Sequence, residues 1–211
     1  ALSGDAAFPE IPLNTLTFTA AEKTWQLQSP STIRLTDPGI TFDPVTIESA
    51  AGKVYSAGRF SEEYADLVLE MNDMDISYLT RLAPVESLPD VTGDLFLDAS
   101  LKGNPELPEI ELVLNANNLS VAGQEGSLNI SAIHDSSGIR INTLDVDLKK
   151  YLSLTGSGFL PVTAGTAGIN IDDFSSSSFS LSGSTENVEA FLPPDTDIPG
   201  IAEETAITVE L

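Results

Sequence analysis

The amino-acid sequence predicts a mainly β protein whose strands form an antiparallel sheet. Most segments alternate apolar and polar residues with the period of two that half-buried strands require. Turn residues such as Gly, Pro, Asn and Asp separate these segments. Helical patterns are brief and end at proline. These three observations favour a sheet over any α/β arrangement.

Composition excludes several classes of function. The chain has 211 residues, of which 41% are hydrophobic and 19% charged, so it can bury a substantial core. Nine Lys and Arg stand against 32 Asp and Glu, which gives a net charge of -23. Because nucleic acids are bound chiefly by cations that neutralise phosphates, this balance argues against a nucleic-acid partner. The absence of cysteine excludes disulfides, thiolate metal sites and a cysteine nucleophile.

The strand-like segments follow one another along the chain, and each places apolar side chains on one side. They are Leu16 and Phe18 in NTLTFTA, Ile33 and Leu35 in STIRL, Leu67 and Leu69 in ADLVLEM, Leu95, Leu97, Ala99 and Leu101 before Gly103, Leu112, Leu114 and Ala116 after Pro108, Leu128 and Ile130 in GSLNISA, and Ile139 and Ile141 in SGIRINTLDVDLKK. In the last segment the alternation shifts at Thr143. A β-bulge there would keep Leu144, Val146 and Leu148 on the same face.

Two short segments carry helical signals. In DISYLTRLAP, Asp75 is a candidate N-cap and Pro84 ends the pattern. The segment ENVEAFLPP, residues 186–194, has the same character. The charge-free stretch 151–171 is rich in Gly, Ser and Thr and contains Pro161, so it predicts strands and turns and not a membrane-spanning helix. The chain begins without Met and ends in the strand-like TAITVEL, and we expect a fragment of a longer protein.

A weak internal repeat accompanies this pattern. Residues 87–101 and 197–211 align without a gap at a spacing of 110, and residues 53–60 match 152–159 more loosely. A repeat of this kind is typical of stacked units that each bury their face against their neighbours. We therefore expect residues 1–211 to form one continuous piece of an elongated repeat structure.

Catalytic signals are weak. The only histidine, His134, stands beside Asp135 in a segment that has the character of a hairpin tip, so we expect a solvated loop histidine and no hydrolytic triad. Ser157 lacks the G-x-S-x-G spacing. Paired acids such as Asp73 and Asp75 alternate with apolar residues, as on a solvated strand face, without calcium-loop spacing. The sequence predicts no catalytic residue, no metal site and no cofactor, and hence a protein that is not an enzyme.

Several segments in order resemble the TamB branch of the AsmA-like superfamily, a group of large proteins of the bacterial envelope. The first is TWQLQSPSTIRL, in which a strand with Trp leads into a strand that begins with Ser-Pro. The others are a strand that begins with Gly and ends in LKGNPELPEIEL, the segment NNLSVAG, and the last segment LTGSGFLP. The likeness covers most of the chain. It implies a long, taco-shaped sheet that is open along one side and lined with apolar side chains. Family members are implicated in phospholipid transport to the outer membrane and in outer-membrane protein assembly.

The resemblance and the alternation together predict an elongated, curved antiparallel sheet that forms an open hydrophobic groove for phospholipid acyl chains. The resemblance also implies a periplasmic location, an inner-membrane anchor in the full-length protein, and an outer-membrane partner of the BamA-like (TamA) type that binds through other regions. The expected groove residues are Leu16, Phe18, Ile33, Leu35, Leu67, Leu69, Leu95, Leu97, Leu101, Leu112, Leu114, Leu128, Ile130, Ile139, Ile141, Leu144 and Val146, while Phe96, Asp98, Glu111 and Val113 take the other face.

Two alternatives to a lipid groove stay open. An exposed sheet edge can accept a strand from an unfolded outer-membrane protein, which would make the chain a scaffold for barrel assembly. A closed β-sandwich uses the same alternation and would bury these residues in a dry core.

Overall fold

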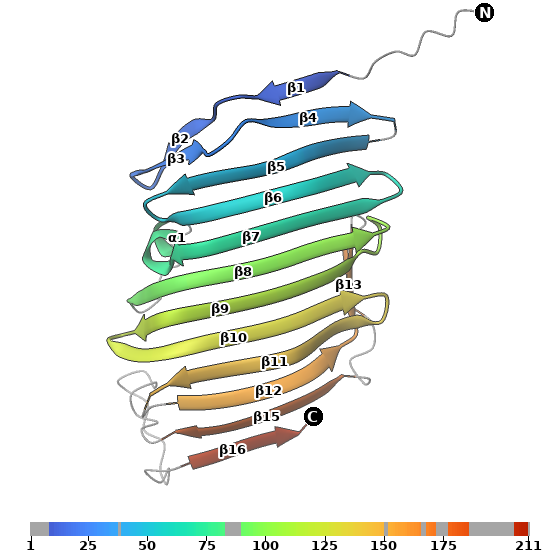
Figure 1. The fold of residues 1–211 in the computed structure, drawn as a ribbon. Coiled ribbons are helices and arrows are strands. Elements are labelled where there is room, and N and C mark those ends of the chain that lie inside the picture. Colours follow the sequence, from blue (N-terminus) through green and yellow to red (C-terminus); the bar gives the residue numbers. More distant parts are fainter. Residues whose placement is uncertain are drawn as a thin grey trace, which may run out of the picture.

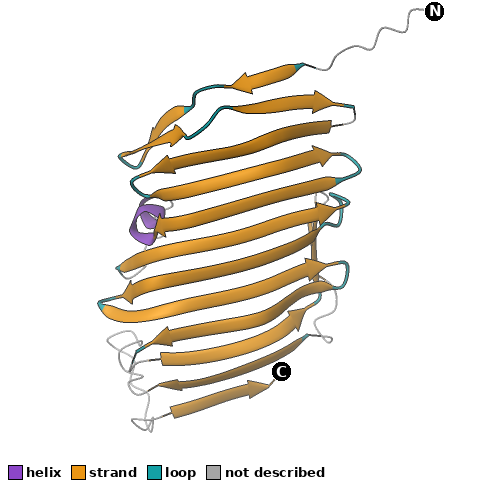
Figure 2. Cartoon of the chain, in the orientation of Figure 1, coloured by secondary structure: helices purple, strands orange, loops and turns teal. Residues whose placement is uncertain are grey.

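The computed structural model describes residues 9–37, 39–82, 90–149, 152–165, 168–171, 177–185 and 205–210. Strands make up most of these residues, and one short helix accompanies them (Figure 2). Among the described residues, fourteen strands form a single sheet and two more form a separate hairpin. The predicted mainly β fold with an elongated, open antiparallel sheet is therefore confirmed.

The sheet is a meander in which most strands pair with the next strand along the chain (Figure 1). Its path runs β1-β4-β5-β6-β7-β8-β9-β10-β11-β12-β15-β16, and its two end strands do not pair with each other. The central strands are β5 (Gly39–Ser49), β6 (Gly52–Ser61), β7 (Ala65–Asp75), β8 (Val91–Gly103), β9 (Glu109–Val121), β10 (Gln124–Asp135) and β11 (Gly138–Leu148). The path ends with β12 (Leu152–Leu160), β15 (Ser178–Thr185) and β16 (Thr205–Glu210).

Two short strands share β5 as a neighbour at the N-terminal end of the sheet. β4 (Ser31–Thr36) pairs with the first part of β5, and β3 (Lys23–Leu27) pairs with a later part. β1 (Glu10–Leu13) flanks β4, and β2 (Thr17–Ala20) forms a hairpin with β3. Pro44 lies between the two pairings of β5. Its missing N–H therefore interrupts neither ladder.

Bulges keep the apolar residues in phase. Where β11 pairs with β10 and β12, the register shifts around Asn142 and Thr143, so Ile141 and Leu144 stay on one face. This confirms the bulge predicted at Thr143. The pairing of β7 with β8 shifts in the same way before Met74.

The helix α1 (Ile76–Leu82) directly follows β7. The carboxylate of Asp75 accepts hydrogen bonds from the hydroxyl and the backbone N–H of Ser77, which lowers the pKa of that carboxyl. These bonds cap the first turn, as predicted for Asp75. Because α1 packs with Met71 and Val54, it covers part of the apolar side of the sheet.

Tyr78 fixes α1 to the N-terminal hairpin. Its side chain is 1% exposed, and its hydroxyl accepts a hydrogen bond from Trp25 Nε1 at 2.7 Å and donates one to the carbonyl of Ala20 at 3.2 Å. Phe18 stacks on Trp25 with 6.3 Å between ring centroids.

The strands of the sheet end along two opposite edges. We call the edge that holds α1 and the turn 122–123 the helix edge. We call the edge that holds the turns 61–64, 104–108 and 136–137 the tip edge.

The charge-free stretch forms strands, as predicted. β12 pairs with β11, and β13 (Val162–Gly165) forms a hairpin with β14 (Gly168–Ile171). In the part of the chain that the structure describes, no helix is long and apolar enough to cross a membrane. The second helical candidate, residues 186–194, lies outside the described residues, as do residues 87–89, 197–204 and 211 of the predicted repeat. The repeat therefore stays a prediction.

We expect Tyr78→Phe to lower the free energy of unfolding by about 1 to 3 kcal/mol, because it leaves the buried Trp25 Nε1–H without its partner. Urea denaturation followed by the fluorescence of Trp25, the only tryptophan, measures the change. The exposed Tyr64 gives the matched control, since Tyr64→Phe should cost less than about 0.5 kcal/mol. Equal losses in the two variants would contradict the anchoring role of Tyr78.

Candidate functional site: an apolar sheet face

One face of the sheet is apolar from strand to strand. Directly paired residues of neighbouring strands share a face, so the register shows which side chains lie together. The helix-side row is Ile47, Val54, Met71, Leu97, Leu114, Ile130, Leu144, Gly156 and Leu181, the central row is Val45, Ser56, Leu69, Ala99, Leu112, Ala132, Ile141, Gly158 and Phe179, and the tip-side row is Phe42, Gly58, Leu67, Leu101, Ile110, His134, Ile139 and Leu160. None of these residues is Asp, Glu, Lys or Arg.

The central row alternates large and small residues. Ser56, Ala99, Ala132 and Gly158 recur on every second strand, about 10 Å apart. At Gly158 the ring of Phe179 fills the space, since an added Cβ would lie 2.9 Å from Phe179 Cγ. The other three small residues, Ser56, Ala99 and Ala132, each pair with aliphatic residues of the neighbouring strands.

Serine hydroxyls on the apolar face donate hydrogen bonds to backbone carbonyls. Ser31 Oγ donates to the carbonyl of Asp43 at 3.1 Å, and Ser56 Oγ donates to the carbonyl of Val68 at 2.9 Å. Hydroxyls satisfied in this way place little polarity on the surface. The face is therefore more apolar than its residue names suggest.

His134 is not the solvated loop residue that the sequence predicts. It lies in β10, is 7% exposed and pairs with Ile110 and Ile139 on the apolar face. Its Nδ1 is 2.8 Å from the carbonyl oxygen of Pro108, to which an N–H at this atom donates. The turn itself is Ser136 and Ser137, as predicted. The prediction was wrong for His134 because the strand continues to Asp135.

The opposite face is polar. Asp98 pairs with Val113 and Ser100 with Glu111, so these side chains take the other side of β8 and β9, as predicted. Val113, which is 38% exposed, and Phe96, which pairs with Asn115, are apolar exceptions on this face, as predicted. Acidic residues such as Asp98 and Glu111 therefore lie away from the apolar rows.

Exposure varies along the apolar face, and both edges include buried residues, since Ala65 and His134 at the tip edge are 0% and 7% exposed. Trp25, Leu119 and Leu148 lie near the helix edge and are at most 7% exposed. At the tip edge, Ile40 and Phe60 are 43% and 41% exposed. The large residues of the helix-side and central rows between these edges are half-buried.

A single layer leaves a large surface uncovered. Within the described residues, the strands of the large sheet contact their sheet neighbours and α1, and β13 of the small hairpin contacts β10 and β11. Because β13 and β14 have only four residues each, this hairpin is too small to cover the three rows. The closed sandwich is therefore contradicted for this part of the chain.

The register unites most of the predicted groove residues on the apolar face. Among those outside the three rows, Ile33 pairs with Phe42 and Leu35 pairs with Ile40. Leu95 and Leu128 both pair with Ala116, and Val146 pairs with Leu128. Phe18 lies at the helix edge with Trp25. Leu16 precedes β2, which begins at Thr17, and is 37% exposed. That these residues line a lipid groove stays a prediction.

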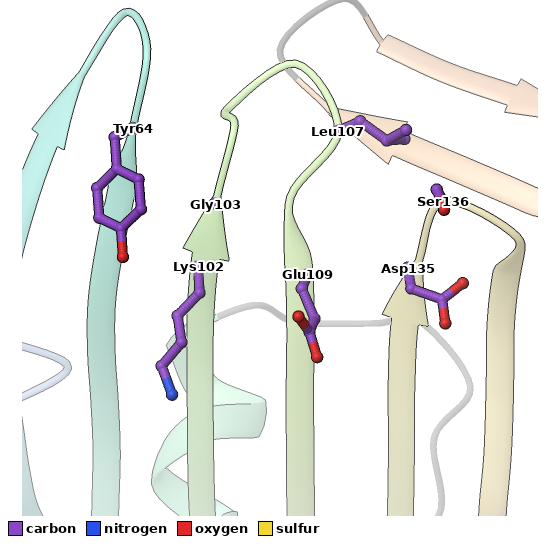
Figure 3. A pocket seen from close by; sticks show the side chains of 7 residues that line it. All are labelled: Tyr64, Lys102, Gly103, Leu107, Glu109, Asp135 and Ser136. Carbon is purple, nitrogen blue, oxygen red and sulfur yellow. The ribbon is translucent and has the colours of Figure 1, made fainter.

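A hollow of about 430 Å³ lies at the tip edge, between the turns that end three pairs of strands (Figure 3). Its lining residues are Tyr64, Lys102, Gly103, Leu107, Glu109, Asp135 and Ser136. Lys102 pairs with Glu109 in the register, which places both on the polar face at the end of their strands. Hydrogen bonds from the hydroxyl and the N–H of Ser137 lower the pKa of Asp135.

In the described part of the chain, no three His, Asp or Glu side chains lie close enough together to hold a metal ion. Of the predicted solvated acids, Asp73 is exposed and Asp75 caps α1.

The chain matches no family model, no curated protein and no solved structure. The apolar face is therefore the feature that a functional account has to explain.

We expect Leu114→Arg to lower the free energy of unfolding by less than about 2 kcal/mol, because an arginine on an uncovered face can extend its guanidinium to water. Leu148→Arg makes the same change at a residue that is 6% exposed, and it should cost more than about 3 kcal/mol because the charge is buried without a partner. Urea denaturation of both variants measures the difference. Equal losses would show that Leu114 lies in a closed core.

Proposed function

We propose that this chain is a non-enzymatic part of a bacterial envelope protein whose apolar face carries phospholipid acyl chains across the periplasm, in support of outer-membrane biogenesis. The observation that carries the proposal is the uncovered apolar face. Two of its rows cross nine strands, and strands lie about 4.8 Å apart, so the face extends roughly 40 Å along the sheet. Soluble monomers rarely expose a contiguous apolar patch above a few hundred Å² unless the patch binds something.

The energetic need for such a face follows from the cost of exposing lipid tails to water. Two acyl chains of about sixteen carbons, at roughly 0.8 kcal/mol per methylene, cost on the order of 25 kcal/mol to expose. A carrier therefore has to keep them covered along the whole path. A sheet face meets this need with one rule, which is an uncharged and mostly aliphatic residue at every second position of each strand.

Movement along the face requires that no position binds much more tightly than the next. The rows contain no Asp, Glu, Lys or Arg, and the hydroxyls of Ser31 and Ser56 are engaged with backbone carbonyls. An acyl chain that passes from strand to strand thus meets similar aliphatic surroundings. This uniformity favours transport over fixed storage.

The compartment and the protein partner rest on the likeness to TamB proteins. That likeness supports a periplasmic location, a membrane anchor elsewhere in the full-length protein, and contact with a BamA-like (TamA) outer-membrane protein through other regions. The support that comes from the described residues is the apolar face.

A second candidate function is favoured by the ends of the sheet. Among the described strands, β1 and β16 each pair on one side only, so each leaves a backbone edge that can accept another strand. An unfolded outer-membrane protein could add a strand there. This function predicts polypeptide along an edge, whereas the lipid carrier predicts acyl chains on the apolar face.

A photoreactive residue in place of Leu114 should crosslink to phospholipid in cells, because Leu114 lies on the apolar face. The same residue in place of Asp98, on the opposite face of the neighbouring strand, should not. Mass spectrometry of the purified adducts identifies what was captured. Polypeptide adducts without lipid would favour the second function, and equal lipid capture at both positions would contradict the carrier.

A large side chain at a small residue of the central row should slow transport without unfolding the sheet. We expect Ala99→Trp to reduce the rate at which lipid passes between donor and acceptor vesicles by at least about fivefold, because the indole occupies space that acyl chains need. Ser100→Trp adds the same bulk on the polar face of the same strand and is the matched control. Equal rates for the two variants would show that the central row is not on the path.

A further inference from the structure

The two ends of the sheet differ in what their backbones offer to an added strand. In an antiparallel pair, successive residues turn their N–H and C=O groups alternately toward the partner strand and away from it. At an end strand, the groups that turn away lie on the free edge and can bind another strand. Among the described strands, such edges lie at β1 and β2 at one end of the path and at β16 at the other (Figure 1).

Proline removes a donor from the free edge of β1. The N–H of Leu35 donates to the carbonyl of Pro9 at 3.2 Å, so Pro9 turns its carbonyl toward β4. By alternation, Glu10 and Pro12 turn their backbone groups toward the free edge. Because Pro12 has no N–H, Glu10 alone offers a donor along β1.

The rest of the N-terminal end is also unsuited to a long added strand. The carboxylate of Glu10 accepts a hydrogen bond from Arg34 Nε at 3.1 Å, which places an ion pair at the edge strand. β1 and β2 have four residues each, and residues 14–16 separate them. Short strands, proline and charge are the features with which natural sheets prevent strand addition. The N-terminal end is therefore protected.

β16 lacks this protection. It has six residues, Thr205–Glu210, and pairs with β15 without a register shift. The strand contains no proline, so either alternate set of its residues presents three successive N–H groups to the free edge. Its one charged residue, Glu210, stands at its end. The β16 edge is therefore a continuous backbone template.

We infer that strand addition to this sheet is confined to the β16 edge, and that the partner is an extended polypeptide whose apolar and polar residues alternate. This inference rests on the second candidate function and does not depend on the lipid carrier. The sheet has one apolar and one polar face, so an added strand continues both faces only if it alternates with period two. Strands of outer-membrane barrels alternate in this way. A second copy of the chain is a poorer partner, because each copy carries a net charge of -23.

Disulfide trapping of a strand peptide tests this inference. The chain has no cysteine, so one introduced cysteine is its only thiol. The probe is a synthetic peptide of about eight residues that alternates Val and Thr and carries one central Cys. Mixed disulfides form where two paired strands bring the thiols together, and mass spectrometry counts them. We expect Thr208→Cys in β16 to trap the peptide at least about tenfold faster than Ile11→Cys in β1, where Ile11 is 50% exposed.

Two controls separate strand addition from simple contact with an exposed thiol. A peptide with Pro in place of two Thr residues lacks the donors for a ladder, so both variants should trap it equally slowly. Pro12→Val restores a donor to the β1 edge. Added to Ile11→Cys, it should raise trapping of the alternating peptide by at least about threefold.

The outcomes distinguish the inference from the second candidate function. Equal trapping at β16 and β1, or no effect of Pro12→Val, would overturn the confinement to β16 and leave that function in place. Trapping at neither edge, or equal trapping of the proline peptide, would overturn both and leave the lipid carrier untouched. Thr208→Cys chains that link mainly to each other would overturn the polypeptide partner and assign the edge to a second copy. Fast trapping at β16 that the proline peptide loses, with the gain from Pro12→Val at β1, supports the inference.

Discussion

The structure depends on one constraint, which is that every strand keeps its apolar residues in phase with its neighbours. A slip of one residue would move a whole strand's aliphatic side chains to the polar face. The chain breaks strict alternation between Phe42 and Val45, between Met71 and Met74, and between Ile141 and Leu144. At each break the register shifts, so the apolar residue after the break returns to the same face. The bulges therefore preserve the continuous rows.

Backbone conformation shows how these breaks are accommodated. Asp73 and Asn118 adopt positive φ angles of 52° and 50° next to two of the register shifts. Asp and Asn tolerate this left-handed region better than most residues do. Asn118 separates Ala116 from Leu119, which are both buried in one apolar cluster. Local residue choice thus supports the long-range order of the face.

Much of the fold could be predicted from the sequence because period-two alternation is a local signal. The strands, the bulge at Thr143 and the cap at Asp75 all follow from neighbours in the chain. The contact between Trp25 and Tyr78 could not be predicted, since it joins residues 53 positions apart through side-chain geometry. The alternation of large and small residues in the central row also could not be predicted, because it depends on which residues of neighbouring strands pair with each other. His134 is a different case, since it continues the apolar phase of Leu128, Ile130 and Ala132 and could have been placed by the same rule.

Buried and half-buried residues occupy different parts of the apolar face. The buried clusters around Tyr78 and Leu148 lie at the helix edge, where side chains are sealed from water and contribute most to holding the sheet. The rows between the edges are half-buried, so their aliphatic side chains retain surface that another apolar molecule can cover. The net charge of -23 complements this division, because mutual repulsion disfavours contact between the open faces of two copies. A face whose rows are half-buried and whose copies repel each other keeps apolar surface that a small apolar molecule can cover.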